Sequence, residues 1–259
     1  MTLDREVILR ASVDWRWVPD GAERLELGGI EAIDYPSWAR MGFQATPHQV
    51  DNPDAAVKAI VDAARARGRN EIDWWISPSA TPAVEGTLIA LGARLDARID
   101  ILAADLTKPI ATVRNGRVEA LLVDNAERLD DFEHVAAAVW GGAPSSGERR
   151  EQQLAGLPID AEGSFRVVAY SDDEPITSAG CQLAGEVARL YGGATLPEAR
   201  GLGGYSATVH KRVEIAVENG ARTGLVHARV DTSKPILVRM GFSEFGHARV
   251  YKMPVGEPR

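Results

Sequence analysis

Apolar residues recur at helical and strand spacings along most of this chain, and glycines separate many of the segments. From residue 118 onward the spacing predicts a strand, two helices, three successive strands, a helix, a strand, a helix and a final strand. The predicted segments are 118–123, 127–140, 148–157, 165–170, 176–184, 187–195, 205–219, 224–229, a helix that follows Thr232 or Ser233 and ends before Gly241, and 244–253. This order favours an α/β (α+β) fold in which helices flank a mixed, largely antiparallel sheet.

The first half of the chain repeats the end of the second half. Helix, strand, helix and strand are predicted at 53–67, 72–76, 82–91 and 97–106. Gly68 and Gly92 follow its helices, as Gly220 and Gly241 follow the corresponding helices of the second half. Any α/β chain alternates helices and strands, so the pattern by itself leaves open whether the halves are copies of one fold.

Turn-forming residues at 105–116 separate the two halves. Lys108-Pro109 and Asn115-Gly116 lie there between two apolar strands. We predict one domain at 1–110 and a second at 116–259. The pattern assigns no elements to residues 1–50, and we interpret their aromatic residues as core: Trp15, Trp17, Tyr35 and Trp38.

The charge balance is acidic, with 29 Lys and Arg against 37 Asp and Glu, or −8 at pH 7. An acidic chain is a poor general binder of nucleic acid and repels anions at long range, so a phosphate site has to be built locally. One cysteine, Cys181, excludes an internal disulfide and a cysteine-based zinc cage. No apolar run reaches the ~18 residues of a membrane span, and the N-terminus is a poor signal peptide. We therefore expect a cytoplasmic protein without membrane or nucleic-acid partners.

A glycine-rich segment from Tyr191 to Tyr205 carries the chemistry. Gly192 and Gly193 fall within a strand, where adjacent glycines are typical of a bulge or of a ligand that runs against the backbone. A second glycine cluster follows Arg200 and leads directly into a helix. The unpaired amides and the dipole at a helix start bind pyrophosphate without net positive charge on the protein. The segment therefore predicts a phosphate-binding loop.

Four other interpretations of the loop are weaker. No Gly-Lys-Ser/Thr sequence closes it as in a P-loop, and its glycines do not fit the G-x-G-x-x-G dinucleotide pattern. Residues 204–208 imitate the G-x-S-x-G elbow of serine hydrolases around Ser206, with Asp231 and His247 downstream, but Thr208 replaces the last glycine. An ordinary turn accounts for one or two glycines, but it accounts poorly for two glycine clusters that both lie close to the start of one helix.

The loop resembles the acetyl-CoA loop of the GNAT superfamily of N-acetyltransferases, whose pattern is Arg/Gln-x-x-Gly-x-Gly/Ala. Arg200 and Gly203 match this pattern, and Tyr205 replaces its last small residue. Residues 231–242 resemble the last helix of the family with its Leu-Gly-Phe ending. The resemblance covers about 118–256 and implies a tandem GNAT protein whose first copy is degenerate and lacks the cofactor loop.

The resemblance implies acetyl-CoA as co-substrate and no metal. Backbone groups around Ala194 and Leu196 would hold the pantetheine arm, the amides of residues 201–206 the pyrophosphate, and a strand amide near Thr195 the developing oxyanion. The candidate cofactor-binding residues are Ala194, Thr195, Leu196, Arg200, Gly201, Leu202, Gly203, Gly204, Tyr205 and Ser206.

The usual proton-handling residues of the family are missing here. The acidic base position on the strand falls at Arg189, and the tyrosine position on the last helix falls at Leu237. Tyr191, on the same strand face as Arg189, and Glu186, acting through water, are the catalytic candidates. Each also has an ordinary structural explanation, as a strand aromatic and as a hairpin residue.

These features predict an N-acetyltransferase that moves an acetyl or short acyl group from a CoA thioester to a primary amine. The acceptor is a small-molecule amine or a peptide, and homodimerisation is left open. A non-catalytic acyl-CoA sensor is the second hypothesis, because Arg189 and Leu237 occupy the proton-handling positions. A serine hydrolase at Ser206 is the third.

Overall fold

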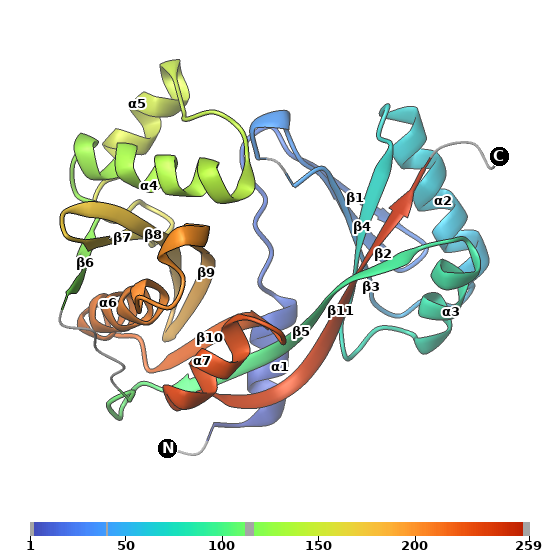
Figure 1. Cartoon of the computed structure of the whole chain (residues 1–259). Helices are drawn as coiled ribbons and strands as arrows, with labels where there is room; N and C mark the ends of the chain where they lie inside the picture. Colours follow the sequence, from blue (N-terminus) through green and yellow to red (C-terminus); the bar gives the residue numbers. More distant parts are fainter. Residues whose placement is uncertain (1–2, 40, 112–116, 256–259) are drawn as a thin grey trace. The chain divides into compact units, whose positions relative to one another are not determined.

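The computed structural model describes residues 3–39, 41–111 and 117–255 (Figure 1), and its contacts divide the chain into two compact units. The loop unit combines Met1–Ser12 with Leu102–Phe245, and the companion unit combines Val13–Ile101 with Gly246–Arg259. Each unit is thus built from two separate stretches, whereas the domains predicted from the sequence are continuous. Residues 112–116 of the predicted linker lie outside the described residues, and the domain boundary stays a prediction.

The loop unit contains the elements that the sequence predicts from residue 118 to Gly241, close to their predicted ends, whereas most of the last predicted strand lies in the companion unit. They are β6 (Val118–Leu122), α4 (Ala126–Trp140), α5 (Gly147–Ala155), β7 (Ser164–Ser171), β8 (Glu174–Ala184), β9 (Val187–Thr195), the short 3-10 helix η2 (Pro197–Ala199), α6 (Gly204–Glu218), β10 (Thr223–Arg229) and α7 (Ser233–Arg239), preceded by α1 (Arg5–Val13). Among the described residues, no helix has the length and apolar character needed to cross a membrane.

The sheet of the loop unit is mixed and largely antiparallel. β6, β7, β8 and β9 pair in antiparallel order, and β10 is parallel to β9. Val167 of β7 packs in the apolar core beneath α6, whereas the next residue, Val168, packs with Leu129 of α4. Because successive strand residues point to opposite faces, α6 and α4 cover opposite faces of this sheet.

The companion unit places two helices against strands that pair in largely antiparallel order. Its elements are β1 (Glu23–Leu27), β2 (Ile30–Asp34), the 3-10 helix η1 (Ser37–Ala39), β3 (Phe43–Pro47), α2 (Pro53–Ala66), β4 (Glu71–Ile76), α3 (Pro82–Ala90), most of β5 (Arg94–Asp105) and most of β11 (Ser243–Pro254). β3 and β4 are parallel, and the pairs β1–β2, β2–β3 and β4–β11 are antiparallel. Trp74 and Ile60, both fully buried, belong to its core.

The order helix, glycine, strand, helix, glycine, strand occurs in both repeats, as predicted. Gly68, Gly92, Gly220 and Gly241 each follow a helix and have φ between 68° and 98°. Glycine adopts this conformation at little cost, which is why the same residue recurs at all four helix ends. The strand after α3 ends beside β10 in the loop unit, and the strand after α7 ends beside β4 in the companion unit. Each unit is therefore completed by the last strand of the other repeat.

Two side chains predicted in the core are exposed. Trp17 and Trp38 are 40% and 36% exposed, although Tyr35 is buried as predicted. The two tryptophan rings pack edge to face on each other, and Trp17 stacks on Tyr35, so only part of each ring is covered.

Leu88→Ala should lower the free energy of unfolding by about 2–5 kcal/mol, because this α3 side chain is fully buried in the companion core. Leu91→Ala is the matched control, since Leu91 is 56% exposed. Its cost should stay below about 1 kcal/mol. Urea unfolding followed by circular dichroism measures both variants, and equal losses would contradict the packing of α3 described here.

Candidate functional site

The parallel pairing of β9 with β10 ends part-way along both strands. Val187 to Leu190 pair with Thr223 to Val226, but β9 continues to Thr195 and β10 to Arg229. The remaining part of β9 stays paired with β8 on its other side. Its second edge therefore faces the opening between the two strands, where an extended ligand can pair with the backbone.

β9 bulges at its two adjacent glycines, as the sequence indicates. Ser178 of β8 lies opposite Ala194, whereas Gly180 lies opposite Tyr191, so β9 has one more residue than β8 between these pairs. Gly192 has a φ of 60°, which an L side chain rarely adopts. A bulge bends the strand that carries it, and this one lies just beyond the last residue paired with β10.

The loop after β9 enters α6 through two glycines with different physical roles. Gly203 precedes the helix as its N-terminal cap residue and has a φ of 96°. Gly204 begins the helix in close contact with β8, since a Cβ there would lie 2.2 Å from Oγ1 of Thr177. The first requirement is conformational and the second is steric, so neither position accepts another residue easily.

The first amides of α6 are not capped by any side chain among the described residues. The starts of α2 and α4 differ, because Asn52 and Asn125 accept hydrogen bonds from the amides of Ala55 and Arg128. An anion at the start of α6 would thus meet amides without a competing acceptor, and Arg200 adds a positive charge from an exposed loop position.

A buried arginine, which the sequence analysis does not single out, holds the strands beside the bulge. Arg212 is 1% exposed, and its Nη1 donates to the carbonyls of Gly180 at 2.9 Å and Tyr191 at 3.3 Å. Its Nε donates to the carbonyl of Thr208 at 3.0 Å. Within the described part of the chain no carboxylate pairs with it, and burial lowers its pKa. Helical spacing could have identified this residue from the sequence, because Arg212 follows the core residue Val209 by three positions and therefore lies on the buried face of α6.

Tyr205 covers the bulge from the first turn of α6. A Cβ at Gly193 would lie 2.6 Å from Cε2 of Tyr205, so the ring packs directly against the β9 backbone. The Tyr205 hydroxyl interacts with Ser233 and Arg212, and burial raises its pKa. The side chain that replaces the family's small residue thus joins α6 to the start of α7.

The face of the sheet opposite α6 is polar near the opening. Leu190 faces the α6 core, so alternation places Arg189 and Tyr191 on the opposite face. Arg189 Nη1 donates to Oε1 of Gln182 at 3.4 Å. Tyr191 is 38% exposed, yet its hydroxyl end packs over Gly180, where a Cβ would lie 2.8 Å from the hydroxyl oxygen.

The predicted cofactor residues are not all equally available to a ligand. Ala194 and Thr195 lie on the stretch of β9 beyond the pairing with β10, as the prediction requires. The amide of Leu196 instead donates to the carbonyl of Ile176 at 3.0 Å, so it is already engaged. Ser206 is 5% exposed within α6, which disfavours its hydroxyl as an accessible nucleophile.

Solved structures match this fold over nearly the whole chain. A GCN5-related N-acetyltransferase (GNAT) from Kribbella flavida matches with a TM-score of 0.68 and 17% identity, covering 99% of this chain and 97% of that chain. A GNAT from Sphaerobacter thermophilus matches with a TM-score of 0.65 and 14% identity over 96% of this chain and 86% of that chain. A tandem GNAT protein from the clavulanic acid biosynthesis pathway matches with a TM-score of 0.56 and 13% identity over 97% and 89% of the two chains. The fold is that of a tandem GNAT protein.

No protein-family model matches the chain, and no curated protein matches its sequence. At 13–17% identity the likeness to solved GNAT structures concerns the fold, so the chemistry has to be argued from the residues of this chain.

The two candidate catalytic residues, Glu186 and Tyr191, lie far apart on this fold. Glu186 is in the turn before β9, where its carboxylate pairs with Arg222 at 3.1 Å. Five residues of strand, or about 16 Å, separate it from Tyr191 at the opening. Burial of the hydroxyl raises the pKa of Tyr191, so this side chain keeps its proton at neutral pH and suits a donor better than an acceptor. Leu237 is fully buried in the apolar core beneath α6.

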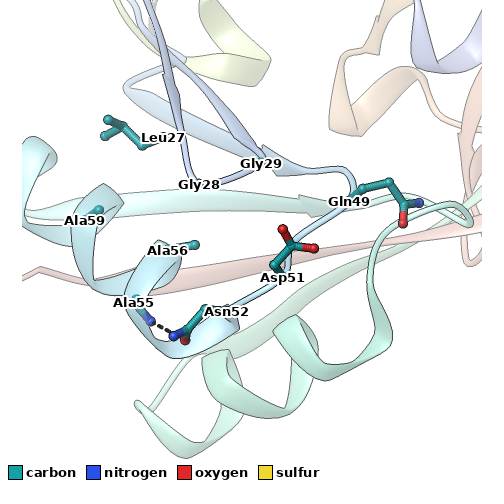
Figure 2. A pocket seen from close by; sticks show the side chains of 9 residues that line it. All are labelled: Leu27, Gly28, Gly29, Gln49, Asp51, Asn52, Ala55, Ala56 and Ala59. Atoms are coloured by element: carbon teal, nitrogen blue, oxygen red, sulfur yellow. Dashed lines mark hydrogen bonds between the residues drawn. The ribbon is translucent and has the colours of Figure 1, made fainter.

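In the companion unit, α2 occupies the place in the repeat that α6 occupies in the loop unit, but the two helices start differently. A pocket of about 480 Å³ lies at the start of α2. Figure 2 shows the residues that line it: Leu27, Gly28, Gly29, Gln49, Asp51, Asn52, Ala55, Ala56 and Ala59. Asn52 Oδ1 accepts from the amide of Ala55 at 3.1 Å, and Pro53 has no N–H to offer. The exposed carboxylate of Asp51 adds a negative charge. We therefore place the candidate pyrophosphate site in the loop unit alone.

Gly204→Ala should lower the free energy of unfolding by about 1–3 kcal/mol, because the new Cβ would overlap Oγ1 of Thr177. Gly86→Ala is the control, since Gly86 lies inside α3 with open space around it and should gain about 0.5–1 kcal/mol. The double variant Gly204→Ala/Thr177→Ala should lose less free energy of unfolding than the two single variants lose together. Strict additivity in urea unfolding would contradict the close contact between α6 and β8.

Proposed function

We propose that this chain is an acetyl-CoA-dependent N-acetyltransferase, which moves an acetyl or short acyl group from a CoA thioester to a primary amine of a small molecule or peptide. The observation that carries the proposal is the meeting of three features at one end of β9. These are the end of pairing with β10, the bulge at Gly192 and Gly193, and the uncapped start of α6. The tandem GNAT fold, shared with proteins named as acetyltransferases, supports the same function.

The three features suit the parts of acetyl-CoA. The amide groups of its pantetheine arm would pair with the edge of β9 around Ala194, as an added strand does. Its pyrophosphate would accept hydrogen bonds from the first amides of α6, with Arg200 as a nearby cation. A site made of backbone amides explains how a chain of net charge −8 binds a strongly anionic ligand.

The thioester supplies the activated acyl group, and the chain supplies orientation, charge stabilisation and proton transfer. A strand amide near Thr195 would stabilise the oxyanion that forms when the amine attacks. Tyr191 would donate a proton to the departing CoA sulfur, which fits a hydroxyl that keeps its proton at neutral pH.

A non-catalytic acyl-CoA sensor is the second candidate function. The observation that favours it is the pair of replacements at the family's proton-handling positions, where Arg189 cannot accept a proton and Leu237 lies in the apolar core. Release of free CoA that depends on added amine separates the two functions, because a sensor binds acetyl-CoA without turning it over.

Leu202→Glu should weaken acetyl-CoA binding about fivefold, because the new carboxylate at this 41% exposed loop position would repel the pyrophosphate by about 1 kcal/mol. Isothermal titration calorimetry on the wild type, Leu202→Glu and the neutral Leu202→Gln measures the effect. Acetyl-pantetheine, which lacks the pyrophosphate, should bind all three proteins alike. A folded wild type that binds no acetyl-CoA would rule out both the transferase and the sensor.

Tyr191→Phe should lower kcat about 100-fold at unchanged acetyl-CoA affinity, because the departing sulfur loses its proton donor. Tyr170→Phe is the matched control, since the Tyr170 hydroxyl donates to Asp131 at 2.7 Å beneath α4 and should affect stability rather than turnover. Steady-state release of CoA measures kcat. The same kcat in wild type and Tyr191→Phe would remove Tyr191 from the reaction.

A further inference from the structure

Ser12 and His227 form a side-chain pair on the loop unit that none of the roles above uses. Ser12 Oγ and His227 Nε2 lie 2.7 Å apart, with Ser12 5% exposed and His227 half-buried. Ser12 comes from α1 and His227 from β10, which are separated by 215 residues of sequence. A hydrogen bond of this length holds one ring nitrogen in place and so fixes the orientation of the imidazole.

His227 is the first residue of β10 beyond its pairing with β9. The last parallel pair joins Val226 to Leu190, so the residues that follow, His227 and Tyr191, flank the opening between the strands. Val226 and Leu190 pack in the core beneath α6. Alternation along each strand therefore turns His227 and Tyr191 to the other face, the same polar face for both.

The two arginines near this face cannot serve as the base. Arg189 lies two residues before Tyr191, and Arg166 of β7, whose neighbours Phe165 and Val167 face α6, acts electrostatically on the Tyr191 hydroxyl. Guanidinium groups stay charged and cannot accept a proton. A primary amine with an ammonium pKa near ~10 must lose a proton before it attacks. An imidazole is the side chain whose neutral form accepts that proton near pH 7.

We propose that His227 is the general base of the acetyl transfer and that Ser12 is the positioning residue that holds its ring. This assignment rests on the proposed function. The imidazole takes one proton from the acceptor ammonium, and the freed nitrogen lone pair forms a C–N bond at the thioester carbonyl carbon. The C–S bond breaks, a second N–H proton passes to the sulfur by way of Tyr191, and the imidazolium releases its proton to solvent. The products are the amide, free CoA and one proton, so atoms and charge balance.

His227→Gln tests the assignment, because glutamine can still hydrogen-bond Ser12 but cannot take up the proton. Amine-dependent release of CoA should fall about 10²- to 10⁴-fold in kcat, with acetyl-CoA affinity by calorimetry unchanged. His210→Gln is the matched control, because His210 lies on α6 and its Nε2 bonds the carbonyl of Ala111 at 3.1 Å. Ser12→Ala should lower kcat less than His227→Gln does, since the base is present but poorly oriented.

Two further measurements separate a base from a structural anchor. Free imidazole should restore part of the kcat of His227→Ala, which the loss of a packing contact would not allow. Benzylamine is mostly an ammonium ion at pH 7, whereas aniline is mostly neutral. The kcat defect of His227→Gln should therefore be at least tenfold smaller with aniline, because no proton has to be removed before attack.

The outcomes distinguish the base from the proposed function. An unchanged kcat in His227→Gln, or an equal defect with both amines and no rescue by imidazole, would overturn the assignment and leave the pair as an anchor of α1. A folded wild type that binds acetyl-CoA, but whose release of CoA no added amine stimulates, would overturn the base and the transferase together. The assignment and the proposed function are both supported by one combined outcome. In it the wild type transfers the acetyl group to amines, and His227→Gln binds acetyl-CoA normally but has a much lower kcat.

Discussion

The point where β9 stops pairing with β10 is the constraint on which the rest of the loop unit depends. A strand that leaves its partner inside a covered sheet has backbone groups that need other partners, because a buried unpaired amide or carbonyl is costly. Arg212 meets part of that need by donating to the carbonyls of Gly180 and Tyr191. The arrangement buries a positive charge, and this burial lowers the pKa of Arg212. The opening is therefore a built feature with an energetic cost, as binding sites commonly are.

In the proposed function, the same sheet would separate cofactor binding from proton transfer by its two faces and its edge. The amides at the start of α6 and the edge of β9 belong to the cofactor side, and they require glycines rather than charged residues. The opposite face carries the ionisable side chains Arg189, Tyr191 and His227. The proposed general base on β10 would account for the arginine at the family's usual acidic position on β9, since the proton would then have an acceptor on the neighbouring strand.

Local chemistry made much of this predictable from sequence. Helix ends at Gly68 and Gly220, the bulge at Gly192 and the loop before α6 depend on residues adjacent in the chain, and each was predicted. Contacts between distant segments were not predictable in this way. Ser12 lies on α1, a helix that the sequence pattern did not predict, and its partner His227 lies on a strand 215 residues later. Arg212 was missed for another reason, since a charged residue on an apolar stripe is usually solvated, and only its carbonyl partners explain its burial.

The exchanged final strands have a consequence for synthesis on the ribosome. β4 of the companion unit pairs with residues 249–254 of β11, from Ile76 opposite Arg249 to Glu71 opposite Pro254. Most of this unit has been translated by residue 101, but that edge of β4 waits until about 150 more residues have been added at a rate of about 5–20 per second. For that interval the nascent chain exposes an apolar strand edge of the kind that recruits other chains. The order of the repeats thus leaves the early half of this protein with an unpaired strand edge until the last strand of the chain has been made.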